Sequence, residues 1–283
     1  MSEEPRFADD YVPRQITAAR RVIVDVMQVM ASFRDCLVLV GGWVPDLTIE
    51  NPEEPHVGSI DVDLALDVGK LNEGRYAEML KLLLATKRYR QGDKAFQFIT
   101  EVDLADGLAP VAVEVEFLAP KEIKIRKNKP TLLEGFRVLQ ADGCSAAFHS
   151  PHSQKLTGQM VNGATNTVSL QVASVPDFLV MKAFALNGRD KPKDAYDICY
   201  CLDHYPGGIS ELAEAWLARI KNDDIAKAIG FFREKFESIN AYGPMQVVEF
   251  YNEADPETRQ QQARRAFELV QQFLAEIESE SVA

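Results

Sequence analysis

The sequence is poor in the features that would place it outside a reducing compartment. Cysteine occurs only four times in 283 residues, and no two cysteines form a Cys-x-x-Cys pair. No basic, then apolar, then small-residue leader opens the chain, and its apolar runs fall far short of the roughly 20 residues that a membrane helix needs. We therefore expect a cytoplasmic protein without a membrane span.

Positive charge is also scarce. The chain has 31 Lys and Arg residues against 43 Asp and Glu residues, which gives a net charge of −12. General attraction to nucleic acid is thus not expected, and a polyanionic partner would need a local basic patch. The hydrophobic content of 46% is sufficient for a core in one large domain or two modest ones.

The order of the apolar patterns divides the chain into a mixed part, 1–175, and a C-terminal helical part, 176–283. In the mixed part, helices are expected at 11–34, 73–89 and from Trp43, and strands at 36–40, 59–67, 95–102, 110–119, 136–139 and 165–173. Residues 143–163 carry no firm pattern. Further helices are expected at 176–187, 191–204, 209–220, 223–238 and 256–279, with a break at Tyr242-Gly243-Pro244.

Two carboxylates, Asp61 and Asp63, share one face of the strand expected at 59–67. Their Cβ atoms would lie roughly 7 Å apart. At a buried site two such charges repel each other unless a cation lies between them, and an oxygen-preferring ion such as Mg²⁺ or Mn²⁺ meets that need. The alternative is that this face of the strand simply meets solvent.

Neighbouring residues favour the metal site. Gly41 and Gly42 end the preceding strand, where the absence of side chains lets backbone N–H groups approach a phosphate. Ser59 adds a hydroxyl within reach of a phosphate oxygen. Glu114 and Glu116 share one face of a later strand, and one of them could complete the ion site or accept a proton from an attacking hydroxyl.

The pattern resembles the nucleotidyltransferase superfamily that includes DNA polymerase beta, whose members share hG[GS] followed by Dh[DE]h. Val40-Gly41-Gly42-Trp43 and Asp61-Val62-Asp63-Leu64 fit these two elements. The resemblance implies an α+β fold, with a polymerase-beta-like nucleotidyltransferase core and mixed sheet at 1–175, followed by the helical bundle. It also implies Asp61, Asp63 and Glu116 as metal ligands, with Glu116 preferred to Glu114 because the Phe-Leu pair follows it.

The segment MKAFALNGRDKPKDAYDI at 181–198 resembles the Lys-x₆-Arg and Lys-Asp-h-h-Asp-h segment of the AbiEii-type nucleotidyltransferase toxins from type IV toxin–antitoxin systems. By this resemblance, Lys182 would contact the triphosphate and Asp194 would orient that lysine or the acceptor. Many relatives carry a basic residue four positions before the first aspartate, where this chain has Val57, with His56 beside it.

The residues of that segment also have simpler interpretations. Lys182 and Asp194 could form an ordinary ion pair between two helices. Arg189, Lys191 and Lys193, in the turn between them, could contact phosphate or only face water. Trp43 and Tyr196 could stack on a base, or they could pack in the core.

The sequence therefore predicts an enzyme that uses Mg²⁺ or Mn²⁺ to transfer a nucleoside monophosphate from an NTP to a hydroxyl. Catalysis would involve Asp61, Asp63, Glu116, Lys182 and Asp194, and the nucleotide would be bound by Gly41, Gly42, Ser59, Lys182 and Arg189. The resemblance suggests RNA such as tRNA as the acceptor, bound by the basic run KEIKIRKNK at 121–129, and a cognate antitoxin. The alternatives are transfer to a small molecule or protein, and a non-catalytic nucleotide-binding protein on the same fold.

Overall fold

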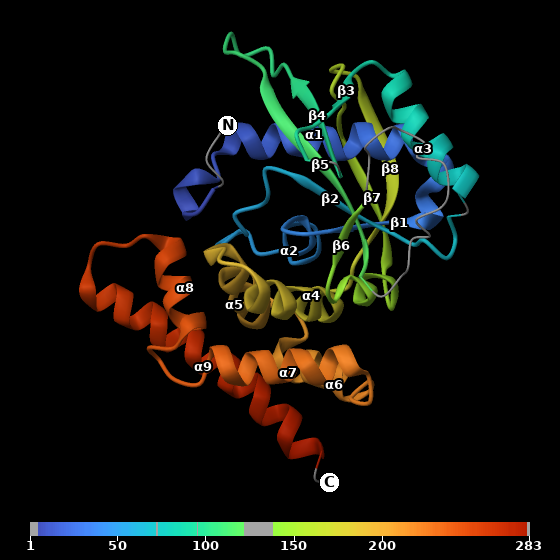
Figure 1. Cartoon of the computed structure of the whole chain (residues 1–283). Coiled ribbons are helices and arrows are strands. Elements are labelled where there is room, and N and C mark those ends of the chain that lie inside the picture. Colours follow the sequence, from blue (N-terminus) through green and yellow to red (C-terminus); the bar gives the residue numbers. More distant parts are fainter. Residues whose placement is uncertain (1–4, 72, 95, 122–137, 282–283) are drawn as a thin grey trace. The chain divides into compact units, whose positions relative to one another are not determined.

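A computed structural model of the protein describes residues 5–71, 73–94, 96–121 and 138–281, and these fold into two compact units (Figure 1). The sheet unit comprises Val12–Val44 and Gly58–Ser174. The helical unit comprises Met1–Tyr11, Pro45–Val57 and Val175–Ala283. The chain thus crosses between the units more than once.

The sheet unit contains most of the strands. Its helices are α1 (Pro13–Val29) and α3 (Glu73–Ala85), and α2 (Trp43–Thr48) begins in this unit. Its strands are β1 (Leu37–Val40), β2 (Val62–Leu66), β3 (Tyr89–Gln91), β4 (Gln97–Val102), β5 (Val111–Pro120), β6 (Leu139–Ala141), β7 (His152–Gln159) and β8 (Thr165–Val172).

These strands form one mixed sheet in the order β3-β4-β5-β2-β1-β8-β7, with β6 paired to β5. The pairs β1–β8, β2–β5 and β5–β6 are parallel. The pairs β1–β2, β3–β4, β4–β5 and β7–β8 are antiparallel. The central position of β1 and β2 matters because these strands flank the Gly-Gly turn and carry the paired aspartates.

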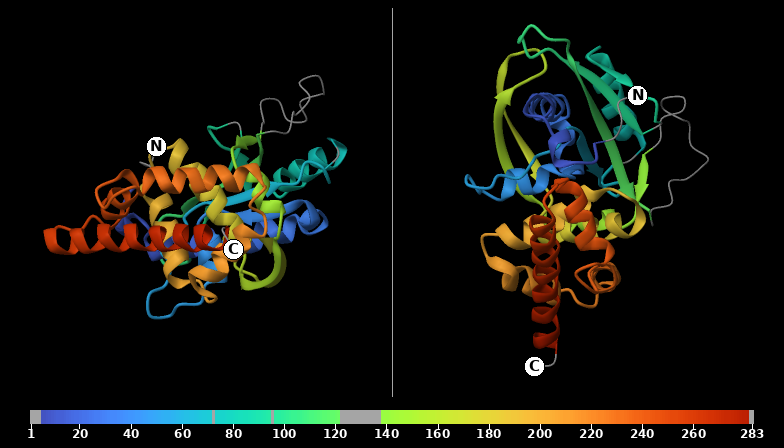
Figure 2. Two further views of the ribbon diagram at one scale, coloured as in Figure 1. Left: turned by 90° about the horizontal axis from the view of Figure 1, so that it is seen from below. Right: turned by 90° about the vertical axis from the view of Figure 1, so that its left-hand side faces the viewer.

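One face of the sheet packs on α1. The helix buries Val22, Ile23 and Val26 completely and contacts β5, β7 and β8. The β5 side chains alternate as a half-buried strand requires, with Val113 and Val115 buried and the residues between them partly exposed. Figure 2 shows the sheet curving around α1.

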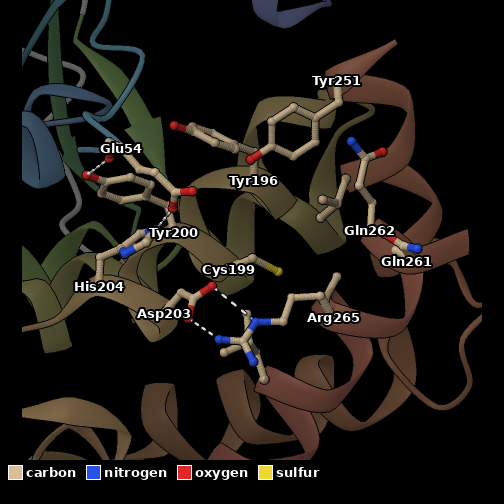
Figure 3. Close-up of a pocket in the computed structure, with 13 residues that line it drawn as sticks. Glu54, Tyr196, Cys199, Tyr200, Asp203, His204, Tyr251, Gln261, Gln262 and Arg265 are labelled. Atoms are coloured by element: carbon tan, nitrogen blue, oxygen red, sulfur yellow. Dashed lines mark hydrogen bonds and ion pairs between the residues drawn. The ribbon is translucent and has the colours of Figure 1, made fainter. Parts of the chain in front are cut away.

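The helical unit contains α4 (Val175–Gly188), α5 (Pro192–His204), α6 (Gly208–Leu217), α7 (Asp223–Lys235), α8 (Tyr242–Tyr251) and α9 (Pro256–Ser281). Trp216 on α6 lies at the centre of its core, with ring centroids 5.5 Å from Phe232 and 5.0 Å from Phe273. Buried aromatic side chains of this size contribute strongly to core stability. Helices α5, α8 and α9 also line a cavity (Figure 3).

The structure confirms the predicted α+β class, with a mixed sheet and C-terminal helices. Three strands and helices of the described residues were missed, and the first is the short strand β3 (Tyr89–Gln91), at the end of the helix predicted at 73–89. Strand β7 (His152–Gln159) lies in the stretch 143–163, to which the sequence analysis assigned no element. It was missed because its residues are mostly polar and exposed. Helix α8 begins at Tyr242, where the sequence predicted a break. Gly243 and Pro244 occupy its first turn, where a backbone N–H has no partner within the helix, so proline is tolerated.

The sequence predicts two domains, 1–175 and 176–283, and this division stays a prediction. The two compact units of the structure differ from these domains in two segments. Residues 1–11 and 45–57 belong to the helical unit. The second segment binds α5, because His56 and Val57 both hydrogen-bond to side chains of that helix. Of the helices in the described ranges, none combines the length and the apolar character that crossing a bilayer requires.

Helix α7 offers a test of the local structure. Asn222 is its N-cap, and its side-chain oxygen accepts hydrogen bonds from the backbone N–H groups of Asp224 at 2.8 Å and Ile225 at 3.3 Å. Replacing Asn222 with Ala should lower the free energy of unfolding by about 1 kcal/mol, measured by denaturant titration. The control Asn222→Asp keeps an acceptor and should retain most of the stability. Equal losses in both variants would show that the cap is not responsible.

Candidate functional site

The predicted site residues fall in two groups, one in each unit. In the sheet unit, Asp61 directly precedes β2 and Asp63 lies within it. Val62 and Leu64 are fully buried, whereas both aspartates are partly exposed, as the two-residue period of a strand requires. The predicted placement of the two aspartates on one strand face thus agrees with the alternation of burial along β2.

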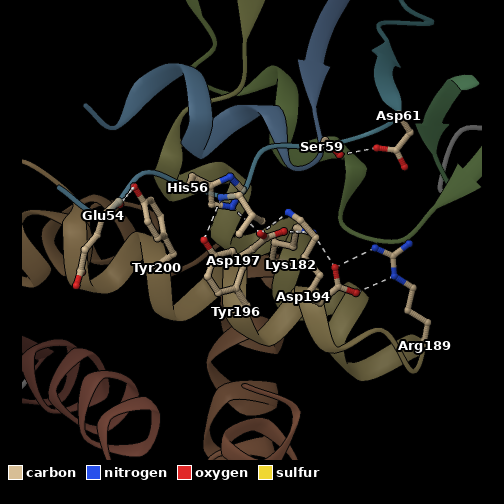
Figure 4. A network of polar contacts seen from close by, with 12 residues as sticks. Glu54, His56, Ser59, Asp61, Lys182, Arg189, Asp194, Tyr196, Asp197 and Tyr200 are labelled. Atoms are coloured by element: carbon tan, nitrogen blue, oxygen red, sulfur yellow. Dashed lines mark hydrogen bonds and ion pairs between the residues drawn. The ribbon is translucent and has the colours of Figure 1, made fainter. Parts of the chain in front are cut away.

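Two hydrogen bonds fix the position of Asp61. Its carboxylate oxygen Oδ1 accepts from the Ser59 hydroxyl at 2.5 Å (Figure 4). Its backbone oxygen accepts from the indole N–H of Trp43 at 2.7 Å. Trp43 is only 1% exposed, so it packs in the core and is not available for stacking on a base. Ser59 thus orients the carboxylate, and its contact with a phosphate stays a prediction.

Position 41 requires glycine for two reasons, which are its backbone conformation and the closeness of Asp63. Its φ of +72° lies in the left-handed region that disfavours other residues. Val40, just before it, pairs in register with Asp63. A Cβ atom on Gly41 would fall inside van der Waals contact with Oδ2 of Asp63. The Gly-Gly turn therefore makes room for the second carboxylate, in addition to any role toward phosphate.

The two aspartates suit a hard divalent cation. Both present carboxylate oxygens, and the space beside Asp63 is the one that a Cβ on Gly41 would fill. Mg²⁺ is usually held by one or two carboxylates together with substrate phosphates. Among the described residues, no group of three or more His, Cys, Asp or Glu side chains is arranged to hold a metal ion. The pair therefore fits an ion that the nucleotide helps to bind.

Glu116 lies beside Asp63 in the sheet, since the two are register partners on parallel strands. Its carboxylate accepts hydrogen bonds from Gln97 at 3.1 Å and Lys94 at 3.3 Å. Glu114 accepts from the same Gln97 amide at 2.6 Å. Glu116 thus does not form a three-carboxylate group with the two aspartates here, and its role as third ligand stays a prediction.

The second group is a buried charge cluster in the helical unit. The ammonium of Lys182 on α4 lies 2.7 Å from Oδ1 of Asp194 and 2.7 Å from Oδ2 of Asp197, both on α5 (Figure 4). Both aspartates are completely buried. The ion pair between two helices that the sequence allowed is therefore present, and it includes Asp197 as well.

The pKa values follow from these contacts. Burial acts to lower the pKa of Lys182, but the charges of Asp194 and Asp197 outweigh it, so the pKa lies above its usual value. Burial acts to raise the pKa of Asp194, but Lys182 and Arg189 outweigh it and lower the pKa to about 2. The pKa of Asp197 is also lowered, because Lys182 and Lys193 outweigh its burial. The three groups are therefore charged at neutral pH.

Two of the turn cations differ in their surroundings. Arg189 makes a two-pronged contact with Asp194, through Nε at 2.7 Å and a terminal nitrogen at 2.9 Å, while half of its side chain stays exposed. Lys193 was expected to contact phosphate or to face water. The solvent-facing alternative is wrong, because Lys193 is only 3% exposed and its ammonium lies 2.6 Å from Asp197, and its contact with phosphate stays untested.

His56 was missed as a member of this cluster. Its Nε2 lies 2.8 Å from Oδ1 of Asp197, and its ring stacks on Tyr196 with centroids 5.2 Å apart. Burial, followed by the nearby charge of Lys193, lowers the pKa of His56 to about 4. The imidazole is therefore neutral at pH 7 and donates its Nε2 hydrogen to Asp197. No local sequence pattern around this single histidine indicates a partner 141 positions away.

The mixed sheet and the C-terminal helices fit a nucleotidyltransferase fold, in which the glycine turn after β1 and the aspartates at positions 61 and 63 are the predicted site. The family model for the nucleotidyl transferase AbiEii toxin of type IV toxin–antitoxin systems matches residues 29–279, and the chain belongs to this family. No curated protein matches the chain. The predicted family and activity class are confirmed: the protein is a nucleotidyltransferase, a class that uses an NTP and a divalent metal ion.

The neutral His56 predicts a specific acid sensitivity. Its pKa is about 4 in the fold against 6.5 when unfolded, so the unfolded chain takes up the proton first as pH falls. The stability from this group is complete above pH 6.5 and is lost toward pH 4, by about 3 kcal/mol. Denaturant titrations between pH 7 and pH 4 should show this loss in the wild type. His56→Gln keeps an N–H donor without a titrating group, so its stability should fall less, and parallel curves would contradict the assignment.

Proposed function

We propose that the protein transfers a nucleoside monophosphate from an NTP to a hydroxyl acceptor in a Mg²⁺-dependent reaction. The observation that carries the proposal is the pair Asp61 and Asp63, with Ser59 fixing the first carboxylate and Gly41 leaving room for the second. A bound Mg²⁺ or Mn²⁺ would neutralise phosphate charge and polarise the reacting phosphoryl group. Asp61 and Asp63 would hold that ion.

The acceptor hydroxyl attacks the α-phosphorus, a new P–O bond forms, and the bond from the α-phosphorus to the bridging oxygen breaks to release pyrophosphate. The hydroxyl proton passes to a carboxylate, for which we propose Glu116. Gly41 and Gly42 would approach the leaving pyrophosphate with their backbone. Most of the acceleration would come from alignment and charge neutralisation.

For the helical unit, we propose that Lys182 contacts the triphosphate and that Asp194 orients Lys182. The ion pair of 2.7 Å between Lys182 and Asp194 supports the orienting role. Arg189 is the more exposed cation, so it has side-chain surface available for a phosphate while it contacts Asp194. Lys193 is left out of this set because Asp197 engages its ammonium at 2.6 Å, whereas Lys182, which is also buried at 7% exposure, is kept on the family resemblance.

We further propose that the acceptor is RNA, such as tRNA, that a cognate antitoxin restrains the enzyme, and that both meet it in the cytoplasm. The family to which the chain belongs supports a toxin with an antitoxin. The basic run at 121–129 is the proposed RNA contact. Its first residue, Lys121, forms an ion pair with Asp142 at 2.7 Å, and the rest of the run lies outside the described residues. The net charge of −12 favours the alternative, a small-molecule or protein acceptor.

Removing either proposed ligand charge should abolish transfer. Asp61→Asn and Asp63→Asn should each lower the rate of pyrophosphate release by about 100-fold or more, because phosphate charge would lose its compensation. Labelled NTPs incubated with Mg²⁺ and total RNA give the measurement. Asp67→Asn is the matched control, since Asp67 follows β2 and pairs with Lys70 at 3.0 Å. Full activity in the Asp61 and Asp63 variants would refute the metal assignment.

The acceptor class can be tested through the basic run. A variant in which alanine replaces Lys124, Arg126, Lys127 and Lys129 should no longer label RNA. The salt dependence of labelling should be lost as well, because contacts with RNA phosphates would be removed. A control variant makes the same charge change at exposed lysines elsewhere, namely Lys81, Lys155, Lys221 and Lys227. If both variants label RNA equally well, RNA binding by the run is wrong. Retained transfer to a small molecule would favour the alternative acceptor.

A further inference from the structure

A row of polar residues crosses three neighbouring strands of the sheet. Gln97 on β4 is the register partner of Glu116 on β5, and Glu116 is the register partner of Asp63 on β2. Side chains of register partners point to the same face of a sheet, and those on antiparallel strands have Cβ atoms about 5 Å apart. Gln97 therefore lies on the face that carries the proposed metal ligand Asp63 and the proposed proton acceptor Glu116.

The amide of Gln97 bonds to two carboxylates at once. Its nitrogen donates to Oε2 of Glu114 at 2.6 Å and to Oε1 of Glu116 at 3.1 Å. Glu114 and Glu116 lie on one face of β5, two residues apart, so their negative charges repel each other. An amide NH₂ group has one hydrogen for each of them. Gln97 therefore holds the two carboxylates at a fixed separation.

The side chain of Gln97 is itself held in place. It is only 2% exposed. The backbone N–H of Gln97 donates to the carbonyl of Lys94 at 3.1 Å, and the backbone N–H of Gly92 donates to the carbonyl of Gln97 at 2.8 Å. A Cβ atom on Gly92 would fall inside van der Waals contact with Oε1 of Gln97. The loop between β3 and β4 thus leaves the space that the Gln97 amide occupies.

Gln97 and Lys94 bind the same oxygen of Glu116. The ammonium of Lys94 lies 3.3 Å from Oε1, the atom that also accepts from Gln97. Because the Lys94 side chain is 57% exposed, its ion pair is a weak restraint, and the buried amide is the stronger one. Neither contact occupies Oε2 of Glu116. The two contacts therefore leave Oε2 as the oxygen that can take a proton.

We propose that Gln97 is a positioning residue for nucleotidyl transfer, which holds Oε1 of Glu116 so that Oε2 stays available to the acceptor hydroxyl. The inference rests on the proposed function, in which Glu116 takes the hydroxyl proton. In that step the O–H bond breaks, its electron pair serves the new P–O bond, and the proton bonds to Oε2. A proton acceptor is most effective when it is held in one geometry. Gln97 acts only through Glu116.

Two variants remove this support in different ways. Gln97→Leu removes the amide donor, whereas Gly92→Ala keeps every polar group but displaces the Gln97 amide with its methyl group. Each should lower kcat about tenfold and leave KM for the NTP unchanged, because the proton acceptor is misplaced while nucleotide contacts persist. Pyrophosphate release with Mg²⁺ and total RNA gives both constants, and denaturant titration shows that each variant is folded.

Matched controls make the same substitutions elsewhere. Gln91→Leu lies at an exposed position of β3, and Gly230→Ala lies on α7, where a Cβ atom meets nothing within 4 Å. Both should keep the wild-type kcat. If Gln97→Leu does not fold, the comparison of Gly92→Ala with Gly230→Ala decides the question, because neither of them removes a hydrogen-bonding group.

A second measurement needs neither metal nor substrate. In ¹⁵N-labelled protein, the side-chain amide resonances of Gln97 are assigned by through-bond NMR experiments. Glu116→Gln should shift these resonances, because the amide donates directly to Glu116. Asp63→Asn makes the same change of charge one strand further away and should shift them much less. Equal shifts in the two variants, or no shift in Glu116→Gln, would overturn the inference.

The variant Glu116→Gln also separates this inference from the proposed function. It should abolish transfer if Glu116 takes the proton. Full transfer in Glu116→Gln would refute that proton acceptor and, with it, the positioning role. If transfer is lost in Glu116→Gln but Gln97→Leu and Gly92→Ala keep the wild-type kcat, only the positioning role is wrong. A rise in KM with unchanged kcat would likewise contradict it, since Gln97 would then act on nucleotide binding.

Discussion

The buried ion pairs around Asp194 and Asp197 are the constraint on which the helical unit depends. Two carboxylates without solvent exposure are tolerable only because Lys182, Lys193 and Arg189 compensate them. Removal of any one partner leaves a buried charge without its counterpart, which is among the most destabilising changes that a fold can suffer. The relative placement of α4 and α5 is therefore fixed by charge as well as by apolar packing.

The same cluster explains why the segment 45–57 belongs to the helical unit although it lies between two strands of the sheet. His56 bonds to Asp197 as a neutral donor, because burial and then the charge of Lys193 lower the pKa of its imidazole. Tyr200 holds the backbone of Glu54 from the next turn of α5. Helix α5 thus carries the buried carboxylates, anchors a distant loop and lines the cavity.

Prediction from the sequence was most accurate for patterns that repeat or recur within a few residues of one another. The period of two predicted which face of β2 carries Asp61 and Asp63, and the family motif predicted the partnership of Lys182 with Asp194. It could not predict His56, because that contact depends on how a loop folds back over 141 positions. Lys193 was misjudged because a lysine in a turn-like sequence is usually solvated, whereas here α5 begins at Pro192 and buries it. The cavity lined by α5, α8 and α9 requires three helices and has no local signature.

The arrangement at β2 limits how a nucleotide can bind. Asp61 and Asp63 form an electronegative surface on a chain that is itself acidic, so a triphosphate without a cation would be repelled. Gly41 has no side chain, and this leaves the space that the Asp63 carboxylate occupies. Glu116 is already engaged by Lys94 and Gln97. The metal ion and the nucleotide should therefore bind cooperatively. The role of the protein is to hold the carboxylates of Asp61 and Asp63 at a fixed separation at the central strand β2.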